Sequence, residues 1–513
     1  MRSLLVAAVA AASLVLAACG QEADPEKRLV AANFETQVED TTGCGIPLSF
    51  DPNSPAFMTT DISGGILTDQ AAVDCYAWQM FIALNWPVDS GWPATASQAG
   101  VPNRSASASS WGVSIQGQPT PTTVWQSYKG ADETFLPGGA APSGWGEVAA
   151  LPAQCTSDNR LLAGVAASPA MPMLSQISKA PKRLSQNELL ASAADTGFSS
   201  SINEAFGGWL TDQKGKLAYF DRRMGKAEFD YIVSNQLYLA ANQAKVATSA
   251  DAGISLPKGA AFRGTPSLPL ATQDQLGAIE VKIAWRDLTT EQDLWNRYLT
   301  SSVYLQDPDT GQCRQAVVGM VGMHIIHKTD HFPDFVWSTF EHVDNVPDPS
   351  RPAPAGGYSF NDGKGTTPSN QPRVKCDSAG NCKPLFPMSE PVQVTRQFPI
   401  PTEVATLNAA VQKMIGEMTG GSSVFQYYEL VNVLWDQAPN PPSPEPGKGA
   451  TSPLSYGSFI SAGPNTVVAN TTLETYIQGT NCTGCHKFAK IASTTSDQDQ
   501  LAADFSFLFG SAH

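Results

Sequence analysis

Positive charge is scarce in this sequence. Its 513 residues include 32 Lys and Arg against 47 Asp and Glu, which gives a formal net charge of −15 at pH 7. Nucleic acids and anionic lipid surfaces attract basic proteins, so this balance argues against both as partners. It favours a basic or neutral protein as the partner.

Common catalytic signatures are also missing. The sequence has no glycine-rich dinucleotide-binding turn, no Gly-x-Ser-x-Gly nucleophile motif and no close spacing of zinc ligands. It has no internal repeats either. These absences favour a protein without catalytic activity, but they leave open whether the chain is an enzyme.

Long apolar runs are limited to the first residues, where the run is too short to span a bilayer. Leu4 to Leu16 is apolar and follows Arg2, and Leu16-Ala17-Ala18-Cys19 supplies a cleavage site of small residues. This pattern predicts a lipoprotein signal peptide over residues 1–18 and a lipid on Cys19, which directly follows the cleavage site. The alternative is ordinary secretion, with Cys19 as one more thiol.

The residues after Cys19 indicate how the protein is held. Gly20 follows, and no aspartate stands where bacterial lipoproteins carry an inner-membrane retention signal. By resemblance to bacterial lipoproteins, we expect an outer-membrane lipoprotein of a Gram-negative cell, facing the periplasm or the cell surface. Residues 19–45 are polar and lack periodicity, which is typical of a tether. The lipid would be the only membrane attachment.

Cysteine is sparse, with nine residues in the chain, and one group of cysteines forms a motif. Cys482-Thr483-Gly484-Cys485-His486 has the pattern of a c-type haem attachment site. Two thiols within one helical turn can each form a thioether with a haem vinyl group, and the adjacent imidazole can bind the iron. We therefore expect one covalent haem c with His486 as axial ligand. A redox Cys-x-x-Cys or half of a zinc site are the alternatives.

Six cysteines remain once Cys19 and the motif are set aside. They are Cys44, Cys75, Cys155, Cys313, Cys376 and Cys382. An even number in an exported protein predicts three disulfides. Cys376 and Cys382 flank a turn-forming pentapeptide and are expected to pair with each other. The other four allow three pairings, and the sequence does not choose among them.

Periodicity predicts an α+β fold, with a mixed, loop-rich main domain over residues 46–435 that contains antiparallel strand pairs and a few amphipathic helices. The abundance of glycine (42) and proline (38) indicates long loops. The expected helices are Cys75 to Trp86, Lys226 to Gln243, Glu403 to Met418 and Val424 to Trp435. The expected strands are Ile279 to Trp285, Val317 to His327 and Phe335 to His342.

The chain that follows the main domain is short. A Pro-rich linker over residues 436–455 leads to a helical haem c segment, residues 456–513, in which only 27 residues follow His486. A complete cytochrome c domain does not fit there, so we expect the segment to pack on the main domain, which supplies most of the pocket. Thr471 to Gln478 is expected to form a helix, and the tail Phe505 to Phe509 to cover part of the haem.

Four of the six histidines lie close together in the sequence. They are His324, His327, His331 and His342. If the two strands pair as a hairpin around Lys328–Pro333, His324 lies opposite Trp337. His327 then faces away from His324, because side chains alternate along a strand.

This strand pair supplies the candidate catalytic residues, which are His324, Glu341 and His342. They could act as a proton relay or as a histidine-and-carboxylate metal site. The alternative is a set of hydrogen-bonded histidines with a structural role. For the distal position of the iron, the candidates are His324 and His342, followed by Met414 or Met418. An open, five-coordinate iron is equally compatible with the sequence.

The strand expected at Ile279 to Trp285 alternates between polar and apolar residues. Glu280, Lys282 and Arg286 share one face of it. A strand of this kind commonly has one face in water, so we interpret the polar face as solvated rather than as a binding site.

Several segments resemble large bacterial lipoproteins of the cytochrome c family whose function is poorly defined and which carry one C-terminal Cys-x-x-Cys-His motif. The resembling segments are Phe81 to Pro87, Glu280 to Arg286, His324 to Thr329, Trp337 to Asn345 and Asn470 to Tyr476. They span most of the mature chain. The resemblance implies an exported, redox-active haem c protein, and it implies neither a substrate nor a catalytic residue.

Three functions agree with the sequence. The first is a membrane-anchored monohaem cytochrome that transfers electrons to or from a redox partner protein. The second is a haem-dependent periplasmic oxidoreductase whose substrate site lies in the large domain. The third is a substrate- or partner-binding lipoprotein with a redox-sensing haem. A main domain larger than one haem needs favours the second, and the missing catalytic signatures favour the first. We take electron transfer as the expected activity.

Overall fold

The computed structural model describes residues 42–44, 47–62, 70–151, 155, 171–176, 209–249, 253–260, 269–307, 311–365, 369–371, 374–376, 382–384, 391–435, 467–479, 481–486, 489–492 and 501–513. The chain divides into two units, Met1–Asp40 and Thr41–His513, and every described residue belongs to the second. The predicted signal peptide, Cys19 and the predicted linker over residues 436–455 lie outside the described residues. Among the residues that are described, no helix is both long and apolar enough to cross a membrane.

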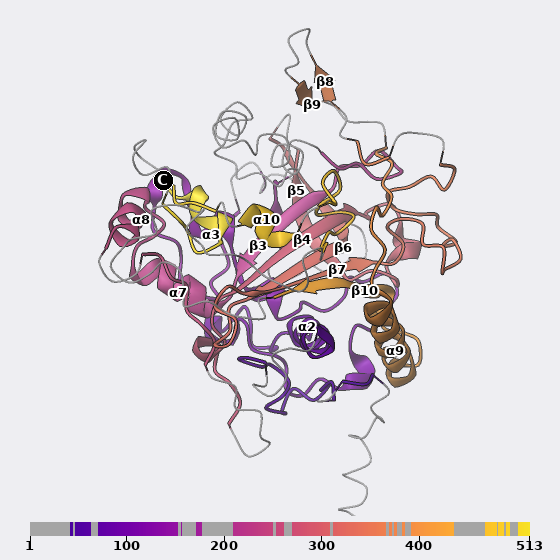
Figure 1. The fold of residues 1–513 in the computed structure, drawn as a ribbon, viewed down its shortest axis with the longest axis horizontal. Coiled ribbons are helices and arrows are strands. Elements are labelled where there is room, and N and C mark those ends of the chain that lie inside the picture. Colours follow the sequence, from indigo (N-terminus) through magenta and orange to yellow (C-terminus); the bar gives the residue numbers. More distant parts are fainter. Residues whose placement is uncertain are drawn as a thin grey trace, which may run out of the picture. The chain divides into compact units, whose positions relative to one another are not determined.

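A sheet of eight strands forms the centre of the second unit (Figure 1). Its main path runs β1-β3-β4-β6-β5-β2, while β7 pairs with β6 and β10 pairs with β7. All pairs are antiparallel except β2 with β5. The strands are β1 (Lys129–Gly130), β2 (Met173–Leu174), β3 (Tyr219–Met224), β4 (Ile279–Asp287), β5 (Thr300–Gln306), β6 (Cys313–His327), β7 (Val336–His342) and β10 (Tyr428–Leu434).

The sheet branches at β6 because this strand is much longer than its neighbours. β5 pairs with β6 up to Gly319, and β7 pairs with it from Gly322 onward, while β4 follows the opposite edge. The long strand therefore brings β3, β4, β7 and β10 into one continuous surface near its C-terminal end.

Most helices are short. The α-helices are α2 (Gln70–Leu84), α3 (Ala131–Thr134), α7 (Lys226–Ser234), α8 (Ala240–Ala247), α9 (Thr402–Thr419) and α10 (Cys482–His486). The 3₁₀ turns are Ala96–Gln98, Ala108–Ser110, Trp125–Ser127, Pro137–Gly139, Gln273–Gln275, Gln292–Leu294, Val424–Tyr427 and Phe507–Ser511. A separate two-stranded sheet contains β8 (Val374–Cys376) and β9 (Cys382–Pro384).

Helices α2 and α9 cover one face of the sheet, and α10 lies on the other (Figure 1). Every residue of α2 from Val73 to Leu84 is buried, which explains why this helix has no polar face. Its Trp78 indole N–H donates to the Asn408 side chain of α9 at 3.0 Å, and that amide donates to the Leu430 carbonyl of β10 at 2.7 Å. These buried hydrogen bonds fix both helices against the sheet.

The predicted α+β class is confirmed, since the described residues form both helices and an antiparallel sheet. The predicted strand pair is present as β6 and β7, but its register differs by two residues. His324 pairs with Thr339 rather than with Trp337. The loop between β6 and β7 continues to Phe335, whose φ of 69° is left-handed. The loop is therefore two residues longer than predicted, and the pairing of β7 with β6 shifts by the same number. A register shift of two residues leaves every side chain on the same face of the sheet, so His327 faces away from His324 as predicted.

Two helices predicted for the main domain are wrong. The helix expected over Lys226 to Gln243 is divided into α7 and α8 by a turn in which Gln236 has a φ of 51°. The helix expected over Val424 to Trp435 is a 3₁₀ turn followed by β10. All seven residues of β10 are buried, and its aromatic and β-branched side chains suit a strand that pairs with β7.

Two disulfides lie in the described residues, and they select one of the three pairings that the sequence left open. Cys44 is bonded to Cys75, and Cys155 is bonded to Cys313. The first bond ties Cys44, which is only 4% exposed, to helix α2. The predicted tether over residues 19–45 therefore extends too far, because its last residues belong to the folded unit.

The third predicted disulfide falls on side chains outside the described residues. The backbones of Cys376 and Cys382 face each other as partners in the ladder between β8 and β9. The expected pairing of these two cysteines stays a prediction.

We predict that replacing the pair Cys155→Ala and Cys313→Ala lowers the free energy of unfolding by about 2–5 kcal/mol. The bond closes a loop with a sequence separation of 158 residues, so it restricts the unfolded chain strongly. The matched control is Cys44→Ala with Cys75→Ala, whose separation is 31 residues. On loop length alone, the control should lose about 1.4 kcal/mol less. Denaturant unfolding followed by circular dichroism measures both, and a larger loss in the control would contradict this ranking.

Candidate functional site

The segment that precedes the Cys-x-x-Cys-His motif is fixed to the sheet by a buried carboxylate. Glu341 of β7 accepts hydrogen bonds from the Thr471 backbone N–H at 2.8 Å and from the Thr471 hydroxyl at 2.9 Å. Its other oxygen forms an ion pair with Arg396. The Glu341 side chain is 1% exposed, so these contacts also compensate the cost of burying its charge.

Asn470 adds a second attachment. Its side-chain amide donates to the Phe340 carbonyl at 2.7 Å and to the Thr339 hydroxyl at 3.1 Å. The segment approaches β6 so closely that a Cβ at Gly322 would lie 2.2 Å from the Thr472 hydroxyl oxygen. Only glycine allows this approach, because any larger residue would displace the segment from the sheet.

The segment is a series of turns rather than the predicted helix over Thr471 to Gln478. The side-chain oxygen of Asn470 accepts from the Thr472 backbone N–H at 2.9 Å and from the Thr472 hydroxyl at 2.8 Å. These local hydrogen bonds compete with helical ones, which is typical of Asn and Thr.

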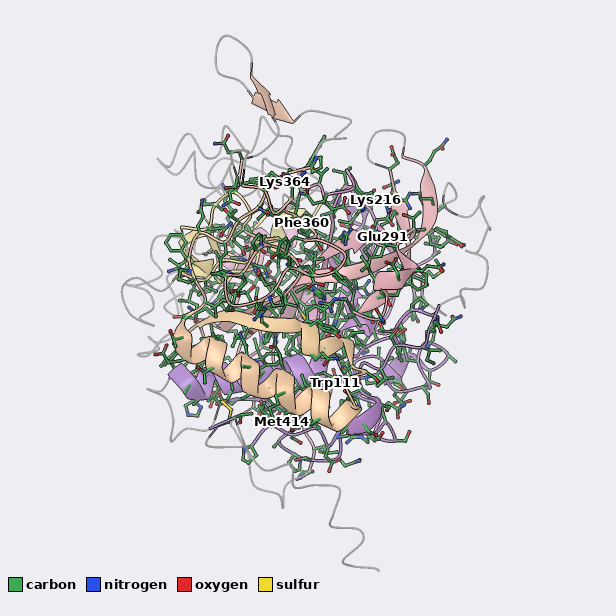
Figure 2. All side chains as sticks on the ribbon, turned by 90° about the vertical axis from the view of Figure 1, so that its right-hand side faces the viewer. Trp111, Lys216, Glu291, Phe360, Lys364 and Met414 are labelled. Atoms are coloured by element: carbon green, nitrogen blue, oxygen red, sulfur yellow. A yellow bond between two sulfur atoms is a disulfide. The ribbon has the colours of Figure 1, made fainter. Side chains whose placement is uncertain are left out.

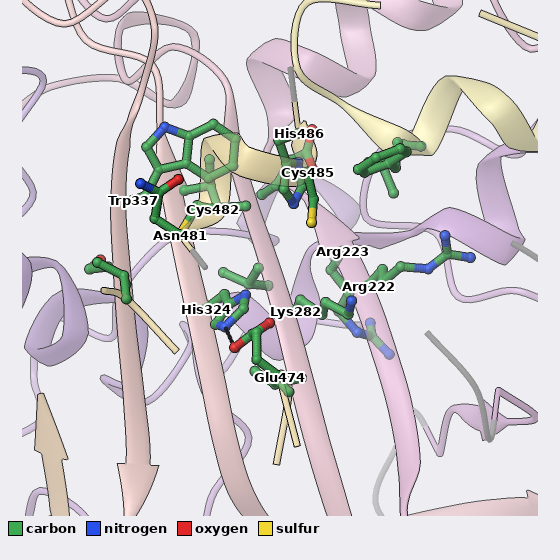
Figure 3. A pocket seen from close by; sticks show the side chains of 18 of the residues that line it. Arg222, Arg223, Lys282, His324, Trp337, Glu474, Asn481, Cys482, Cys485 and His486 are labelled. Atoms are coloured by element: carbon green, nitrogen blue, oxygen red, sulfur yellow. Dashed lines mark hydrogen bonds and ion pairs between the residues drawn. The ribbon is translucent and has the colours of Figure 1, made fainter. Parts of the chain in front are cut away.

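The motif itself forms the single turn α10, which faces a cavity that is partly open to solvent (Figure 3). Strands β3, β4, β6 and β7 form the floor of the cavity, and α10 and the C-terminal tail form its roof. Cys482, Cys485 and His486 all line it. Neither motif cysteine takes part in a disulfide, and burial raises the pKa of the Cys482 thiol.

His486 is held in one orientation. Its Nδ1 lies 2.8 Å from the Phe505 carbonyl oxygen, so Nδ1 carries the proton and donates. The ring packs between Trp337 and Phe507, with centroid distances of 4.7 and 4.9 Å. Burial lowers the pKa of His486 to about 4, so the imidazole is neutral at pH 7 and its Nε2 can bind a metal.

The floor of the cavity carries a row of polar side chains. Arg222 of β3 pairs with Lys282 of β4, which pairs with His324 of β6, and residues directly opposite in a ladder share one face. The prediction that Glu280 and Lys282 face solvent is wrong. Both line the cavity, because the C-terminal segment covers this face of the sheet.

The row is positively charged at one end. Among the described residues Arg222 forms one long ion pair, 3.9 Å from Asp132. Burial lowers the pKa of Lys282 to about 8, a shift that the carboxylate of Glu474 opposes. Two cationic side chains thus line the same wall of a largely apolar cavity (Figure 3).

His324 and Glu474 form a pair across from α10 (Figure 3). Nε2 of His324 lies 3.2 Å from a carboxylate oxygen of Glu474. That same oxygen accepts from the Asn470 backbone N–H at 2.8 Å, which fixes its position. The pair can hold or pass a proton inside the cavity.

The other three histidines of the cluster lie elsewhere. His327 contacts the Tyr76 hydroxyl and lies 2.5 Å from the Leu276 carbonyl oxygen, on the face covered by α2. His331 pairs with Asp61. Burial lowers the pKa of His327 to about 4. These contacts agree with a structural role for both residues.

His342 also lies away from the cavity. Its Nε2 lies 2.9 Å from the Arg297 carbonyl oxygen, and its ring stacks on Tyr298 at 3.9 Å. Burial lowers its pKa to about 4. Of the predicted catalytic residues, only His324 lines the cavity, since Glu341 anchors the segment and His342 is enclosed on the opposite face.

The two candidate methionine ligands are on α9. Met414 lies on the side of the sheet that is opposite to α10 (Figures 1 and 2). Met418 is also on this helix, and it packs against the same hydrophobic core as the side chains of α2. The structure therefore brings neither methionine to the motif.

Sequence reasoning missed two contributors to the cavity, Arg222 and Trp337. Arg222 lies outside the strands that were predicted, and Trp337 was assigned to the wrong pairing. The sequence of β3, Tyr219–Met224, has no alternation of polar and apolar residues that could have identified the first. No local pattern indicates that either residue faces a motif so distant in sequence.

No three His, Cys, Asp or Glu side chains gather as a metal-binding group in the described part of the chain. Comparisons with protein-family models, with curated proteins and with solved structures find no significant match for this chain. The interpretation of the site therefore rests on its own geometry.

We predict that Glu341→Gln loosens the segment over residues 467–479. The amide keeps the shape but loses the charge that Arg396 and the Thr471 N–H bind, and hydrogen bonds to charged groups contribute about 1.5–3 kcal/mol each. Hydrogen exchange of the amides in this segment should become faster. The control is Glu417→Gln on α9, whose carboxylate is 64% exposed. Equal exchange in both variants would show that other contacts hold the segment.

Proposed function

We propose that this chain is an exported, lipid-anchored monohaem c-type cytochrome that transfers electrons to or from a basic or neutral redox partner. The observation that carries the proposal is the geometry of the motif. Its two thiols and its histidine lie on one helical turn at a cavity, and the Phe505 carbonyl orients His486 so that Nε2 is the free nitrogen. This is the arrangement that covalent attachment and axial ligation require.

The cavity has the chemical character of a haem site. Haem presents a flat apolar ring and two carboxylates at one edge. The cavity offers apolar walls, which include Ile326, Val468 and Leu508, and it contains the aromatic ring of Trp337. Lys282 and Arg222 supply two positive charges for the propionates.

Different residues would bind different parts of the haem. Cys482 and Cys485 would form the thioethers, His486 would bind the iron, and Lys282 with Arg222 would neutralise the propionates. When bound, haem supplies a one-electron couple whose potential depends on axial ligation, burial and nearby charge. The neutral imidazole of His486 and the aromatic rings around it favour a stable, water-poor site.

His324 is the residue best situated for the distal side. Among the four predicted distal ligands, it alone lines the cavity in the described structure, and it lies across from α10 (Figure 3). Its Nε2 is engaged with Glu474, so ligation through this nitrogen requires that the hydrogen bond break. This pairing favours a weakly held or open distal position.

The His324–Glu474 pair supports a second candidate function, a haem-dependent periplasmic oxidoreductase. An imidazole with a carboxylate partner beside an open iron position could exchange protons with a small bound molecule. Its substrate site would then be the cavity itself. Electron transfer remains the first proposal, because it needs only the groups that bind the haem.

The first test is covalent attachment. In a host that matures c-type cytochromes, the protein should retain one haem after acid-acetone extraction, because thioethers survive this treatment. Cys482→Ala with Cys485→Ala should release it. Cys44→Ala with Cys75→Ala serves as the matched control, since it also removes two cysteines but leaves the motif intact. Haem that is extracted from the wild type would contradict the proposal.

The second test concerns the distal position. We predict that the ferric protein gives a high-spin spectrum that shifts on adding cyanide, and that His324→Ala alters cyanide binding whereas His342→Ala does not. The reason is that His324 lines the cavity and His342 is enclosed on the opposite face. A low-spin bis-histidine spectrum that His324→Ala abolishes would instead identify His324 as the sixth ligand. An unchanged response in His324→Ala would contradict its distal role.

A further inference from the structure

Glu228 is the most unusual charged residue of the described structure. It lies in the first turn of α7, it is completely buried, and apart from the Glu280 carboxyl its oxygens find no hydrogen-bond partner among the described residues. An ionised carboxylate in such a place is very unfavourable unless it is paired. The position of Glu228 therefore favours the protonated form of its carboxyl.

The nearest titratable neighbour is a second buried carboxyl. The side chain of Glu280 of β4 is hydrogen-bonded to that of Glu228, and such a bond between two carboxyls needs a proton on one of them. Burial, and then the charge of Glu280, raise the pKa of Glu228 well above its usual value. Burial also raises the pKa of Glu280. Two adjacent carboxyls with these environments share protons and titrate as a pair.

The other charged groups around the pair are already engaged or stand at the cavity. Asp504 binds Lys328 at 2.5 Å and accepts from the Leu256 N–H at 2.6 Å. Arg222 and Lys282 face Glu280 from the cavity floor. Within the described residues, no cation therefore neutralises Glu228 directly.

The pair extends from the cavity into the protein interior. Glu280 lines the cavity that Cys485 and His486 also line, whereas Glu228 is not among its lining residues. Glu280 is further hydrogen-bonded to Ser506 of the C-terminal tail. The tail that follows the motif thus contacts both His486, through the Phe505 carbonyl, and the carboxyl pair.

We propose that Glu228 and Glu280 form a proton-binding site that takes up one proton when the haem in the adjoining cavity is reduced. This inference rests on the proposed function. A redox partner protein donates one electron to the ferric haem, and solvent supplies one proton, which converts the singly protonated pair into the doubly protonated one. The combined charge of haem and pair is then unchanged, which a water-poor site requires.

The pair fits this role better than its neighbours do. The Asp504 carboxyl already forms an ion pair with Lys328, and the propionates would pair with Lys282 and Arg222. Among the described residues Glu228 forms no ion pair, and Lys328 affects its pKa less than burial does, so a change of one charge nearby acts on its protonation with little compensation. The proton stabilises the reduced haem, and the reduced haem stabilises the proton, since the coupling is reciprocal.

Redox titration over about pH 5 to pH 8 tests the proposal. Between the pKa values of the pair in the oxidised and reduced protein, each electron brings one proton, so the midpoint potential should fall as pH rises, by about 59 mV per pH unit at most. Below and above this window the potential should be independent of pH. The slope of the midpoint potential against pH thus gives the number of protons that are taken up with each electron.

The decisive variants are Glu228→Gln and Glu280→Gln. In Glu228→Gln the amide can donate to Glu280 and keep it ionised, and in Glu280→Gln the group facing the cavity no longer titrates. Both variants should flatten the dependence of the potential on pH. Glu417→Gln, on the exposed face of α9, is the matched control and should keep the wild-type slope. If Glu228→Gln does not fold, Glu280→Gln at the cavity wall gives the same test.

Redox-difference infrared spectroscopy provides a second readout. Reduction of the wild type should increase the signal of a protonated carboxylic acid, and this signal should be lost in both variants. A pH-dependent potential that persists in both variants would overturn the inference while leaving the haem proposal intact, because the propionates or His324 would then carry the proton. Absence of covalent haem in the wild type would overturn both.

Discussion

The site depends on one buried interaction between β7 and the chain that precedes the motif. Glu341 binds the Thr471 backbone and hydroxyl on one side and Arg396 on the other, and it has almost no contact with water. A charge in such a place is stable only while its partners stay in position. This contact therefore fixes the roof of the cavity to its floor, because separating the two would leave the Glu341 charge buried and unpaired. Gly322 leaves room for the side chains of Asn470 and Thr472 against β6 and so makes the same contact possible sterically.

This contact explains why charges gather in one place in a chain with so few of them. Only 15% of the residues are charged, yet Arg222, Lys282, Glu280 and Glu474 all line one cavity. On an uncovered sheet these charges would interact only weakly, because water would screen them. Covered by the C-terminal segment, they interact strongly with each other and with any charge that enters the cavity. The same covering keeps His486 neutral and ready to bind a metal.

Local patterns in the sequence predicted the parts of the fold that are determined locally. Helix α9 has an apolar stripe and ends where Gly420 adopts a φ of 61°, and both features are visible in the sequence. The motif is visible for the same reason. Strand β10 was missed because a short buried strand and a helical segment have similar apolar content, and only its pairing with β7 decides between them.

The lining of the cavity could not be predicted in this way. Alternation in β4 shows that its two faces differ, but it does not show what covers the polar one. Whether Lys282 faces water or a cavity is decided by Glu341 and Asn470, which belong to other parts of the chain. His324 and His342 look equivalent in sequence, and the face of the sheet on which each lies separates them. The buried pair of Glu228 and Glu280 has no sequence signal, because its members come from a helix and a strand far apart.

The measurement that tests this account most directly is the position of the iron. Anomalous scattering at the iron absorption edge, from crystals of protein matured with haem, would locate it. The account predicts one iron at Nε2 of His486, in the cavity between α10 and the strands β3, β4, β6 and β7, with Lys282 and Arg222 at the propionates. An iron bound outside this cavity, or a motif turned away from the sheet toward solvent, would contradict it.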